Sequence, residues 1–400
     1  MKTMIQMVPS MPVRSNEERR ELRPVGRNVE RYAQIIDGMV DIVKAADELG
    51  YWGMSFIEHH FHSEGFEMLP TPGLMNAWLG PYAKQMRMGQ LGYVMGTQNP
   101  LRVAEETAVL DHILKGRFFV GFARGYQARW VRTLGQQYNT LPTLSNRESE
   151  QQATADDVNQ QIFREMVTIV KKAWTEPSFS YNGEFFKVPF PHEGIEDYPA
   201  YPCAREYGAP GEIDEHDRVS RISVVPAPYQ RPHPPVFISS SGSADSARWS
   251  GEQDFTCCYF APMAGARVQD AAYREGAAQR GHTLSPGQGQ GLLRFLYVAK
   301  TREAAYEKVE KCIVPFFSEF ASHFFPVLLS EGSGSMLERV LNTGLIVAGT
   351  VDDVKRQVAE VYEEIPFEYF SLVAYNGLEP QDQLLEDIEL FATKVAPEFM

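Results

Sequence analysis

The chain has 400 residues, of which 44% are hydrophobic and 22% are charged, and its formal net charge is −14. This composition is typical of a globular protein with a large core, and the acidic balance argues against a nucleic-acid or anionic-membrane surface. A phosphorylated cofactor remains compatible with it, because a single arginine in a pocket can hold one phosphate.

The sequence also argues against secretion and membrane insertion. Residues 1–10 lack the apolar stretch of a signal peptide, and no run of about 18 apolar residues occurs. The cysteines Cys203, Cys257, Cys258 and Cys312 have neither zinc-binding spacing nor the density of a disulfide framework. We therefore expect a cytoplasmic protein that binds neither nucleic acid nor membrane.

Apolar strands and amphipathic helices alternate along the chain. Residues 28–49 have apolar positions at helical spacing, and Gly50 ends that helix as a cap. Further helices are expected over residues 100–114, 158–174 and 382–395. The expected strands are residues 3–8, 52–57, 88–94, 117–122, 236–240, 254–259, 293–299 and 368–374. This alternation predicts an α/β fold with a parallel sheet, and eight units favour a (β/α)8 TIM-type barrel.

Three segments interrupt the alternation. They lie at about residues 127–157, 190–220 and 323–342, and they are polar, acidic with proline and glycine, or rich in glycine and serine. Loops of this length are usually functional or mobile. We expect one barrel domain over residues 1–400 with these insertions, the first two forming a lid or, alternatively, decorating the surface.

Histidines gather directly after the second expected strand, in the run Glu58-His59-His60-Phe61-His62. Barrel enzymes place their active sites at the C-terminal ends of strands. The cluster is compatible with a surface role, with a metal site built on His60 and His62, or with a general base that titrates near neutral pH. The later strand ends supply no obvious further ligands, so we expect a general base and no metal.

Three glycine-containing segments are candidates for contact with a phosphate. Residues 121–126 (GFARGY) carry Arg124, whose planar fork suits a phosphate, although such an arginine is also common in surface loops. Residues 239–243 (SSSGS) precede a helix and form either a phosphate cradle or a plain N-cap at Ser243. Residues 349–353 (GTVDD) have two carboxylates in their first turn, which predicts a structural cap.

The third expected strand contains two glycines, in residues 89–94 (GQLGYV). Glycine inside a strand indicates either close approach of the backbone to a ligand or a local distortion of the strand. A flat ring lying against this backbone and a bulge without any ligand both remain open.

In chain order these segments resemble the bacterial luciferase-like family of flavin-dependent monooxygenases. The resemblance is collinear and covers roughly residues 30–190 and 225–400. It implies a luciferase-like barrel. The segments that carry it are residues 57–61 (IEHHF), 88–117, 121–126, 163–188 and 231–243, followed by the helix start at Gly349-Thr350.

The family binds reduced FMN, lets it react with O2, and oxygenates a small organic substrate through a flavin hydroperoxide. Ala123 and Ser241 stand where luciferase has a reactive cysteine and a glutamate, which puts light emission in doubt but not flavin binding. By position, the resemblance implies a catalytic base at His59, a flavin-supporting non-proline cis peptide at Leu91-Gly92, and phosphate contacts from Arg124, Ser241 and Gly242.

The resemblance also implies partners. A separate flavin reductase would supply the reduced FMN, since no nicotinamide-binding glycine fingerprint follows the first strand, and a homodimer is expected. Three alternatives remain open at this point: a deazaflavin-dependent oxidoreductase of the same fold, a non-catalytic flavin-binding partner subunit, and a barrel metal hydrolase.

Overall fold

A computed structural model of the chain describes residues 1–142, 150–374 and 378–399. Residues 143–149, which belong to the first predicted insertion, lie outside the described residues. Across the described ranges, no helix combines the length and the apolar character that crossing a membrane requires.

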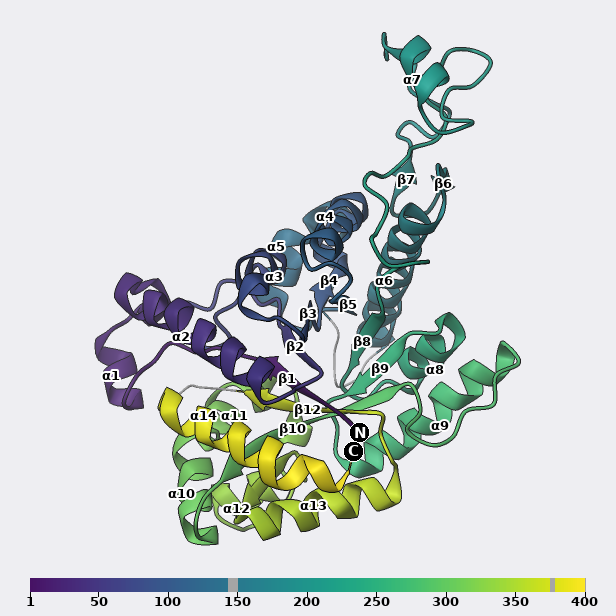
Figure 1. Cartoon of the computed structure of the whole chain (residues 1–400). Helices are drawn as coiled ribbons and strands as arrows, with labels where there is room; N and C mark the ends of the chain where they lie inside the picture. Colours follow the sequence, from purple (N-terminus) through teal and green to yellow (C-terminus); the bar gives the residue numbers. More distant parts are fainter. Residues whose placement is uncertain (143–149, 375–377, 400) are drawn as a thin grey trace. The chain divides into compact units, whose positions relative to one another are not determined.

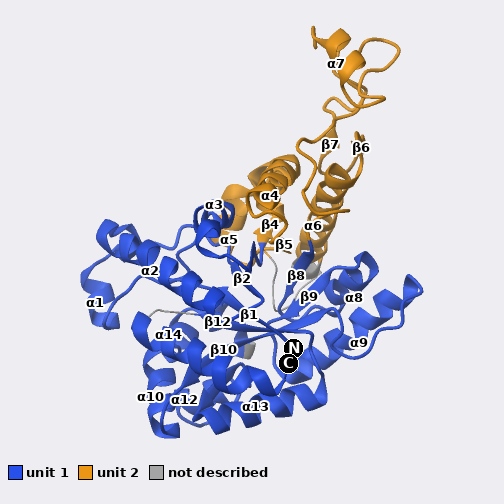
Figure 2. Ribbon diagram, viewed as in Figure 1, with its two compact units in different colours: residues 1–92, 119–121, 235–400 blue, residues 93–118, 122–234 orange. Residues whose placement is uncertain are grey.

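Contacts divide the chain into two compact units, which Figure 2 shows in separate colours. Unit 1 comprises residues 1–92, 119–121 and 235–400, and unit 2 comprises residues 93–118 and 122–234. The prediction of a single barrel domain with insertions stays a prediction.

Eight strands close into a ring in the order β10-β12-β1-β2-β3-β5-β8-β9, and β9 pairs with β10 again; β5 contributes residues 119–121 to unit 1. The predicted parallel eight-stranded barrel is therefore confirmed. The strands of the chain are β1 (Lys2–Met7), β2 (Gly53–Phe56), β3 (Arg87–Gln90), β4 (Tyr93–Val94), β5 (Phe118–Ala123), β6 (Tyr181–Asn182), β7 (Lys187–Val188), β8 (Val236–Ser240), β9 (Thr256–Tyr259), β10 (Gln290–Val298), β11 (Ile346–Gly349) and β12 (Tyr369–Ala374).

The helices of unit 1 cover the barrel strands, and α10, α13 and α14 pack against β10 and β11 (Figure 1). The longest, α2, begins at its N-cap Asn28, which accepts a hydrogen bond from the backbone N–H of Arg31, and ends before Gly50, whose φ is +77°. The helices of unit 1 are α1 (Asn16–Glu21), α2 (Val29–Glu48), α3 (Pro72–Leu79), α8 (Ala244–Gln253), α9 (Met263–Gln279), α10 (Arg302–Cys312), α11 (Val314–Glu319), α12 (Met336–Leu341), α13 (Val351–Glu364) and α14 (Gln381–Leu390).

Unit 2 is mainly helical. Its helix α4 packs against the long helix α6, and the short antiparallel pair β6–β7 and α7 follow α6 in the chain (Figure 2). Pro100 occupies the first turn of α4, as expected. The helices of unit 2 are α4 (Pro100–Ile113), α5 (Ala128–Leu134), α6 (Glu150–Thr175) and α7 (Tyr201–Tyr207).

Large aromatic rings fill the barrel near the N-terminal ends of its strands. The ring of Trp52 lies 5.6 Å from that of Phe119, 6.0 Å from that of Phe237 and 4.9 Å from that of Tyr369. The ammonium group of Lys2 sits over Tyr369 at 4.8 Å from the ring centroid. This packing closes the N-terminal end of the barrel, so chemistry in the barrel belongs at the opposite end.

Differences from the predictions concern, among other elements, the third strand, helix α6 and strand β11. The third strand does not run through residues 88–94 but breaks into β3 and β4 at Leu91-Gly92. Helix α6 begins at Glu150 rather than at residue 158, because its polar first turns lack the apolar periodicity that predicted the rest. Strand β11, which pairs with the C-terminal half of β10, was not predicted.

Candidate active site

The loop that follows β2 is held to neighbouring backbone at several points. The N–H of His59 donates to the carbonyl of Leu69 at 3.0 Å, and the N–H of Met68 donates to the carbonyl of Pro9 at 2.6 Å. The N–H of Gly26 donates to Ser63 O at 2.9 Å. These bonds shape residues 58–69 into a defined turn at the C-terminal end of β2.

This turn gathers His59, His62 and Glu67. Nδ1 of His59 lies 3.0 Å from Oε2 of Glu67, and Nε2 of His62 lies 3.5 Å from the same oxygen. The two imidazole rings stack with centroids 5.9 Å apart and an interplanar angle of 16°. His59, the predicted base, thus has a carboxylate neighbour that the sequence analysis missed.

The remaining histidine of the cluster, His60, is engaged separately, with Nε2 lying 3.0 Å from Oε1 of the buried Glu58. The structure therefore does not bring His60 and His62 together as the metal alternative required. Among the described residues, the group whose ligand atoms converge enough to hold a metal is His59, His62 and Glu67.

The peptide bond between Leu91 and Gly92 is cis, as predicted. The buried side chain of Gln6 donates from Nε2 to the Leu91 carbonyl at 3.2 Å, so a residue of β1 holds this segment from inside the barrel. A Cβ on Gly121 would collide with the Gln90 carbonyl, so the glycine is required for the close approach of these backbones. Gln6 is a second residue that the sequence analysis missed.

Gly89 has a structural explanation of its own. A Cβ at this position would collide with the backbone carbonyl of Phe119 and would lie 2.7 Å from its ring. The glycine therefore allows close packing of Phe119 inside the barrel, an explanation of Gly89 that neither of the two open interpretations included.

The segment between β8 and α8 is exposed at Ser241 and Gly242. Ser243 is the N-cap of α8, and its side chain accepts a hydrogen bond from the N–H of Ser246. Gly242 has a φ of +154°, and a Cβ there would meet open space. The N-cap interpretation and the phosphate-cradle interpretation are compatible with each other, since a capped helix N-terminus that is open to solvent can also bind a phosphate.

At the competing helix start after Gly349, side chains of the protein already bond to the N-terminal backbone groups of the helix. Thr350 and Asp353 form a capping box at the start of α13, as predicted. Asp353 also pairs with Arg302, and this guanidinium holds the pKa of the carboxyl below its ordinary value, with further help from the Thr350 N–H. A phosphate has no comparable opening there.

Arg124 belongs to unit 2, just after β5. Its Nη2 lies 2.6 Å from Oδ1 of Asp156, a side chain that is only 4% exposed. The side chain of Asn159 donates to the Arg124 carbonyl at 3.3 Å. Asp156 was not predicted as a partner of Arg124, because it lies in a polar stretch that was predicted to be an insertion.

The remaining predicted site residues belong to unit 1. His59 follows β2, Leu91 and Gly92 follow β3, and Ser241 and Gly242 follow β8. All three positions are C-terminal ends of barrel strands, where barrel enzymes carry their catalytic groups.

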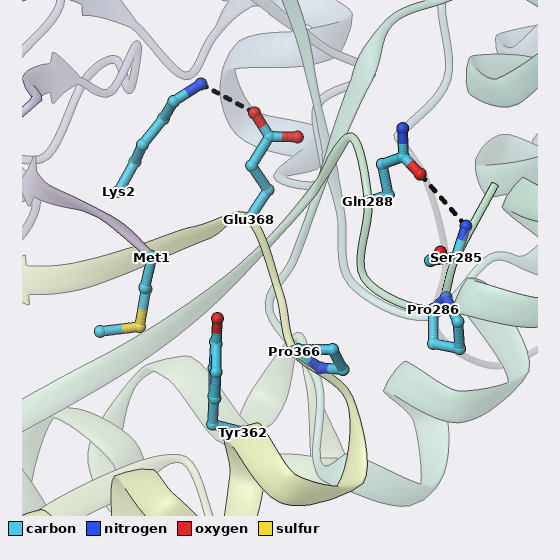
Figure 3. A pocket seen from close by; sticks show the side chains of 8 residues that line it. All are labelled: Met1, Lys2, Ser285, Pro286, Gln288, Tyr362, Pro366 and Glu368. Atoms are coloured by element: carbon cyan, nitrogen blue, oxygen red, sulfur yellow. Dashed lines mark hydrogen bonds and ion pairs between the residues drawn. The ribbon is translucent and has the colours of Figure 1, made fainter. Parts of the chain in front are cut away.

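A pocket of about 470 Å³ lies at the other end of the barrel strands (Figure 3). Its lining includes Lys2 at the start of β1, Gln288 just before β10, and Glu368 just before β12. Lys2 and Glu368, both in this lining, form an ion pair of 2.7 Å. Because the pocket borders N-terminal strand ends, it is not the candidate active site.

The family model of luciferase-like monooxygenases matches residues 23–202 and 210–369. Among characterised relatives, 3,6-diketocamphane 1,6-monooxygenase of Pseudomonas putida is 25% identical over 92% of this chain and 94% of its own. The oxygenase component of the flavin-dependent trigonelline monooxygenase of Acinetobacter baylyi is 24% identical over 52% of this chain and 44% of its own.

Solved structures share the fold along the whole chain. The oxygenating constituent of 3,6-diketocamphane monooxygenase from Pseudomonas putida, in complex with FMN, superposes with a TM-score of 0.71 at 19% identity, covering 100% of this chain and 99% of that one. The coenzyme F420-dependent tetrahydromethanopterin reductase from Methanopyrus kandleri gives a TM-score of 0.62 at 14% identity, covering 100% and 99%. The chain belongs to the luciferase-like monooxygenase family and is an oxidoreductase.

Proposed function

We propose that this protein is the oxygenase component of a two-component monooxygenase, which binds reduced FMN and uses O2 to oxygenate a small organic substrate. The observation that carries the proposal is the placement of His59, the Leu91-Gly92 segment and the Ser241-Gly242 segment at C-terminal strand ends of one barrel. Catalytic and cofactor-binding groups of barrel enzymes occupy this end.

The fit to FMN rests on the start of α8. Backbone N–H groups at a helix N-terminus favour a phosphate, and Gly242 leaves the space beside them open. Ser241 adds an exposed hydroxyl. Arg124 is proposed as a further phosphate contact from its place in the family motif. When bound, reduced FMN would supply the electrons that activate O2.

His59 is proposed as the general base. A neutral imidazole can take a proton from a substrate hydroxyl group, and general-base catalysis of this kind contributes about 10²- to 10⁴-fold. Aromatic rings border the cluster: the ring of Phe320 lies 5.5 Å from that of His62 and 5.1 Å from that of Phe66. Such a surface favours an apolar substrate and excludes water, which protects an oxygenation from wasteful release of hydrogen peroxide.

A separate flavin reductase is proposed as the source of reduced FMN, supported by the relative that is named as an oxygenase component. We further propose a homodimer and a cytoplasmic location. The competing candidate is a deazaflavin-dependent oxidoreductase, because solved structures with this fold include an F420-dependent reductase.

An anaerobic titration tests the proposal first. Reduced FMN should bind at least tenfold more tightly than reduced coenzyme F420, a difference of about 1.4 kcal/mol. Rapid mixing of the FMN complex with oxygenated buffer should then show the transient absorbance of a flavin hydroperoxide. Preference for F420, or binding of FMN without this transient, would contradict the proposal.

Replacement of the base gives the first mutational prediction. His59→Ala should retain affinity for reduced FMN but lower product formation on the order of 10²-fold, because only proton transfer is lost. The measurement is product formed per reduced FMN oxidised, with hydrogen peroxide quantified in parallel. A matched His60→Ala variant should keep most of the activity, and equal losses in both variants would contradict the assignment to His59.

A further inference from the structure

The loop after β2 turns one of its own carboxylates back toward His59. Glu67 adopts a φ of +50°, in the left-handed region that residues with a side chain rarely occupy. A backbone hydrogen bond of 3.0 Å from the Leu69 N–H to the Glu67 carbonyl helps to hold this turn. Such conformations cost about 1–3 kcal/mol, persist only where the surroundings enforce them, and cluster at functional sites.

The carboxylate of Glu67 lies among imidazoles rather than in solvent. Its Oε2 is 3.0 Å from Nδ1 of His59, and the Glu67 side chain is only 7% exposed. His62, whose side chain is 1% exposed, lies 3.5 Å from the same oxygen through Nε2 and faces Glu64 through Nδ1 at 3.8 Å. The ring of Phe320 packs against that of His62 in a T-shaped arrangement. Glu67 therefore faces His59 in a dry environment, where an oriented charge acts strongly.

We propose that Glu67 is the positioning residue of His59. Its carboxylate lies 3.0 Å from Nδ1, within ion-pair distance but outside hydrogen-bond geometry in this structure, and its charge favours the tautomer with the proton on Nδ1, which leaves the Nε2 lone pair to take the substrate proton. This inference rests on the proposed function, in which His59 is the base. A carboxylate on one ring nitrogen sets both the tautomer and the orientation of a catalytic histidine, as in the serine protease triad. His62 is assigned a packing role, since its ring stacks on that of His59 and its Nε2 lies 3.5 Å from the shared carboxylate oxygen.

Nitrogen NMR of the intact, flavin-free protein reads the tautomer directly. The ring signals of His59 are assigned by their loss in His59→Ala. In the unsubstituted protein at neutral pH we expect the proton on Nδ1. In Glu67→Gln the carboxamide can donate to Nδ1 instead, so the proton should move to Nε2. Glu58→Gln is the matched control: it alters the partner of His60 and should leave the His59 signals unchanged.

The same variants are then assayed with a flavin reductase. Glu67→Gln should lower product per reduced FMN oxidised on the order of 10²-fold and raise hydrogen peroxide, with unchanged affinity for reduced FMN. In the His59→Ala background the substitution should have no further effect, because the two residues act through one group. Glu58→Gln should retain the product yield.

Glu67→Gly guards against a failure of folding, because glycine suits the left-handed backbone while removing the carboxylate. An unchanged His59 tautomer in both Glu67 variants would overturn the proposal. Losses that multiply in the double variant with His59→Ala would overturn it as well, as would stoichiometric zinc on His59, His62 and Glu67 in the purified protein. Failure of the protein to bind FMN would contradict the proposed function. The NMR measurement of the His59 tautomer would still show whether Glu67 positions this histidine.

Discussion

Two helix starts in unit 1 have similar local sequences but different surroundings. The segment before α8 reads SSSGS, and the segment GTVDD spans the start of α13. Both combine glycine with a hydroxyl N-cap after a strand. At α13 the N-terminal N–H groups meet the Thr350–Asp353 capping box, and Arg302 neutralises the carboxylate. At α8 only Ser243 caps, and the space beside Gly242 is open.

The difference teaches that a helix N-terminus attracts an anion only if the protein has not already placed one there. Asp353 is the resident anion of α13, with its side chain 11% exposed. The carboxylate in the first turn of α8 is Asp245, which is 53% exposed and lies 3.7 Å from Arg248. Solvent and the arginine screen its charge, so it repels an anion at the helix N-terminus less than Asp353 does. We therefore assign the proposed phosphate contact to α8 and a structural role to α13.

The largest expected effect comes from adding the same charge at both helix starts. Ser241→Asp should weaken binding of reduced FMN on the order of 10²-fold, because two like charges a few ångströms apart repel by several kcal/mol at a protein surface. Thr350→Asp should leave binding unchanged, since aspartate also caps a helix well. Anaerobic titration of both variants measures this difference. An equal loss of FMN affinity in the two variants would contradict the assignment of the phosphate contact to α8.

A smaller effect is expected on stability and its pH dependence. Asp353→Asn should lower the free energy of unfolding at neutral pH by about 2 kcal/mol, the range of a charge-assisted hydrogen bond. The folded-state pKa of Asp353 lies below its ordinary value of 3.8, chiefly because Arg302 donates to the carboxylate. Its stabilisation is therefore present above the ordinary value and is lost as the pH falls toward the folded-state pKa.

Denaturant unfolding across the acid range measures this dependence. The stability gap between the unsubstituted protein and Asp353→Asn should narrow as the pH falls below the ordinary carboxyl pKa. Asp245→Asn serves as the control, because an exposed carboxylate contributes little. A gap of constant size over the whole range would mean that Asp353 does not act through its charge.

The smallest expected effect separates the two caps. Thr350→Ala and Ser243→Ala should each cost about 1 kcal/mol of unfolding free energy, as the loss of an N-cap usually does. The loss at Thr350 should be the larger, since its box satisfies donors reciprocally with Asp353. Thermal unfolding compares the two, and a greater loss at Ser243 would reverse the ranking.

The barrel and the local caps were predictable because their signals are short-range. Apolar runs bounded by turn residues predicted the barrel strands, and the hydroxyl before Asp352 and Asp353 predicted the α13 cap. Strand β11 was missed although its four residues are apolar and buried, because the run is short and follows the third predicted insertion. The first turns of α6 were missed because they are polar. Apolar periodicity cannot predict the first turns of α6, because no face of the helix is apolar there.

The candidate site was predictable only in part. His59, Leu91-Gly92 and Ser241-Gly242 could be named because motifs at strand ends carry them, and the cis bond at Leu91-Gly92 is confirmed. Glu67 and Gln6 could not be named. Glu67 reaches His59 through a left-handed turn eight residues along the chain, and Gln6 reaches the Leu91 carbonyl across the barrel.

The sequence by itself determined the order of the strands, the helix caps and the family, since each follows from local pattern or from motifs read in order. Only the tertiary structure decided which side chains meet. It pairs Glu67 with His59 and Glu58 with His60, although both carboxylates lie within the same loop. The physical reason is that hydrogen bonds and ion pairs depend on ångström-scale geometry, which backbone turns and barrel closure set and which residue spacing does not record.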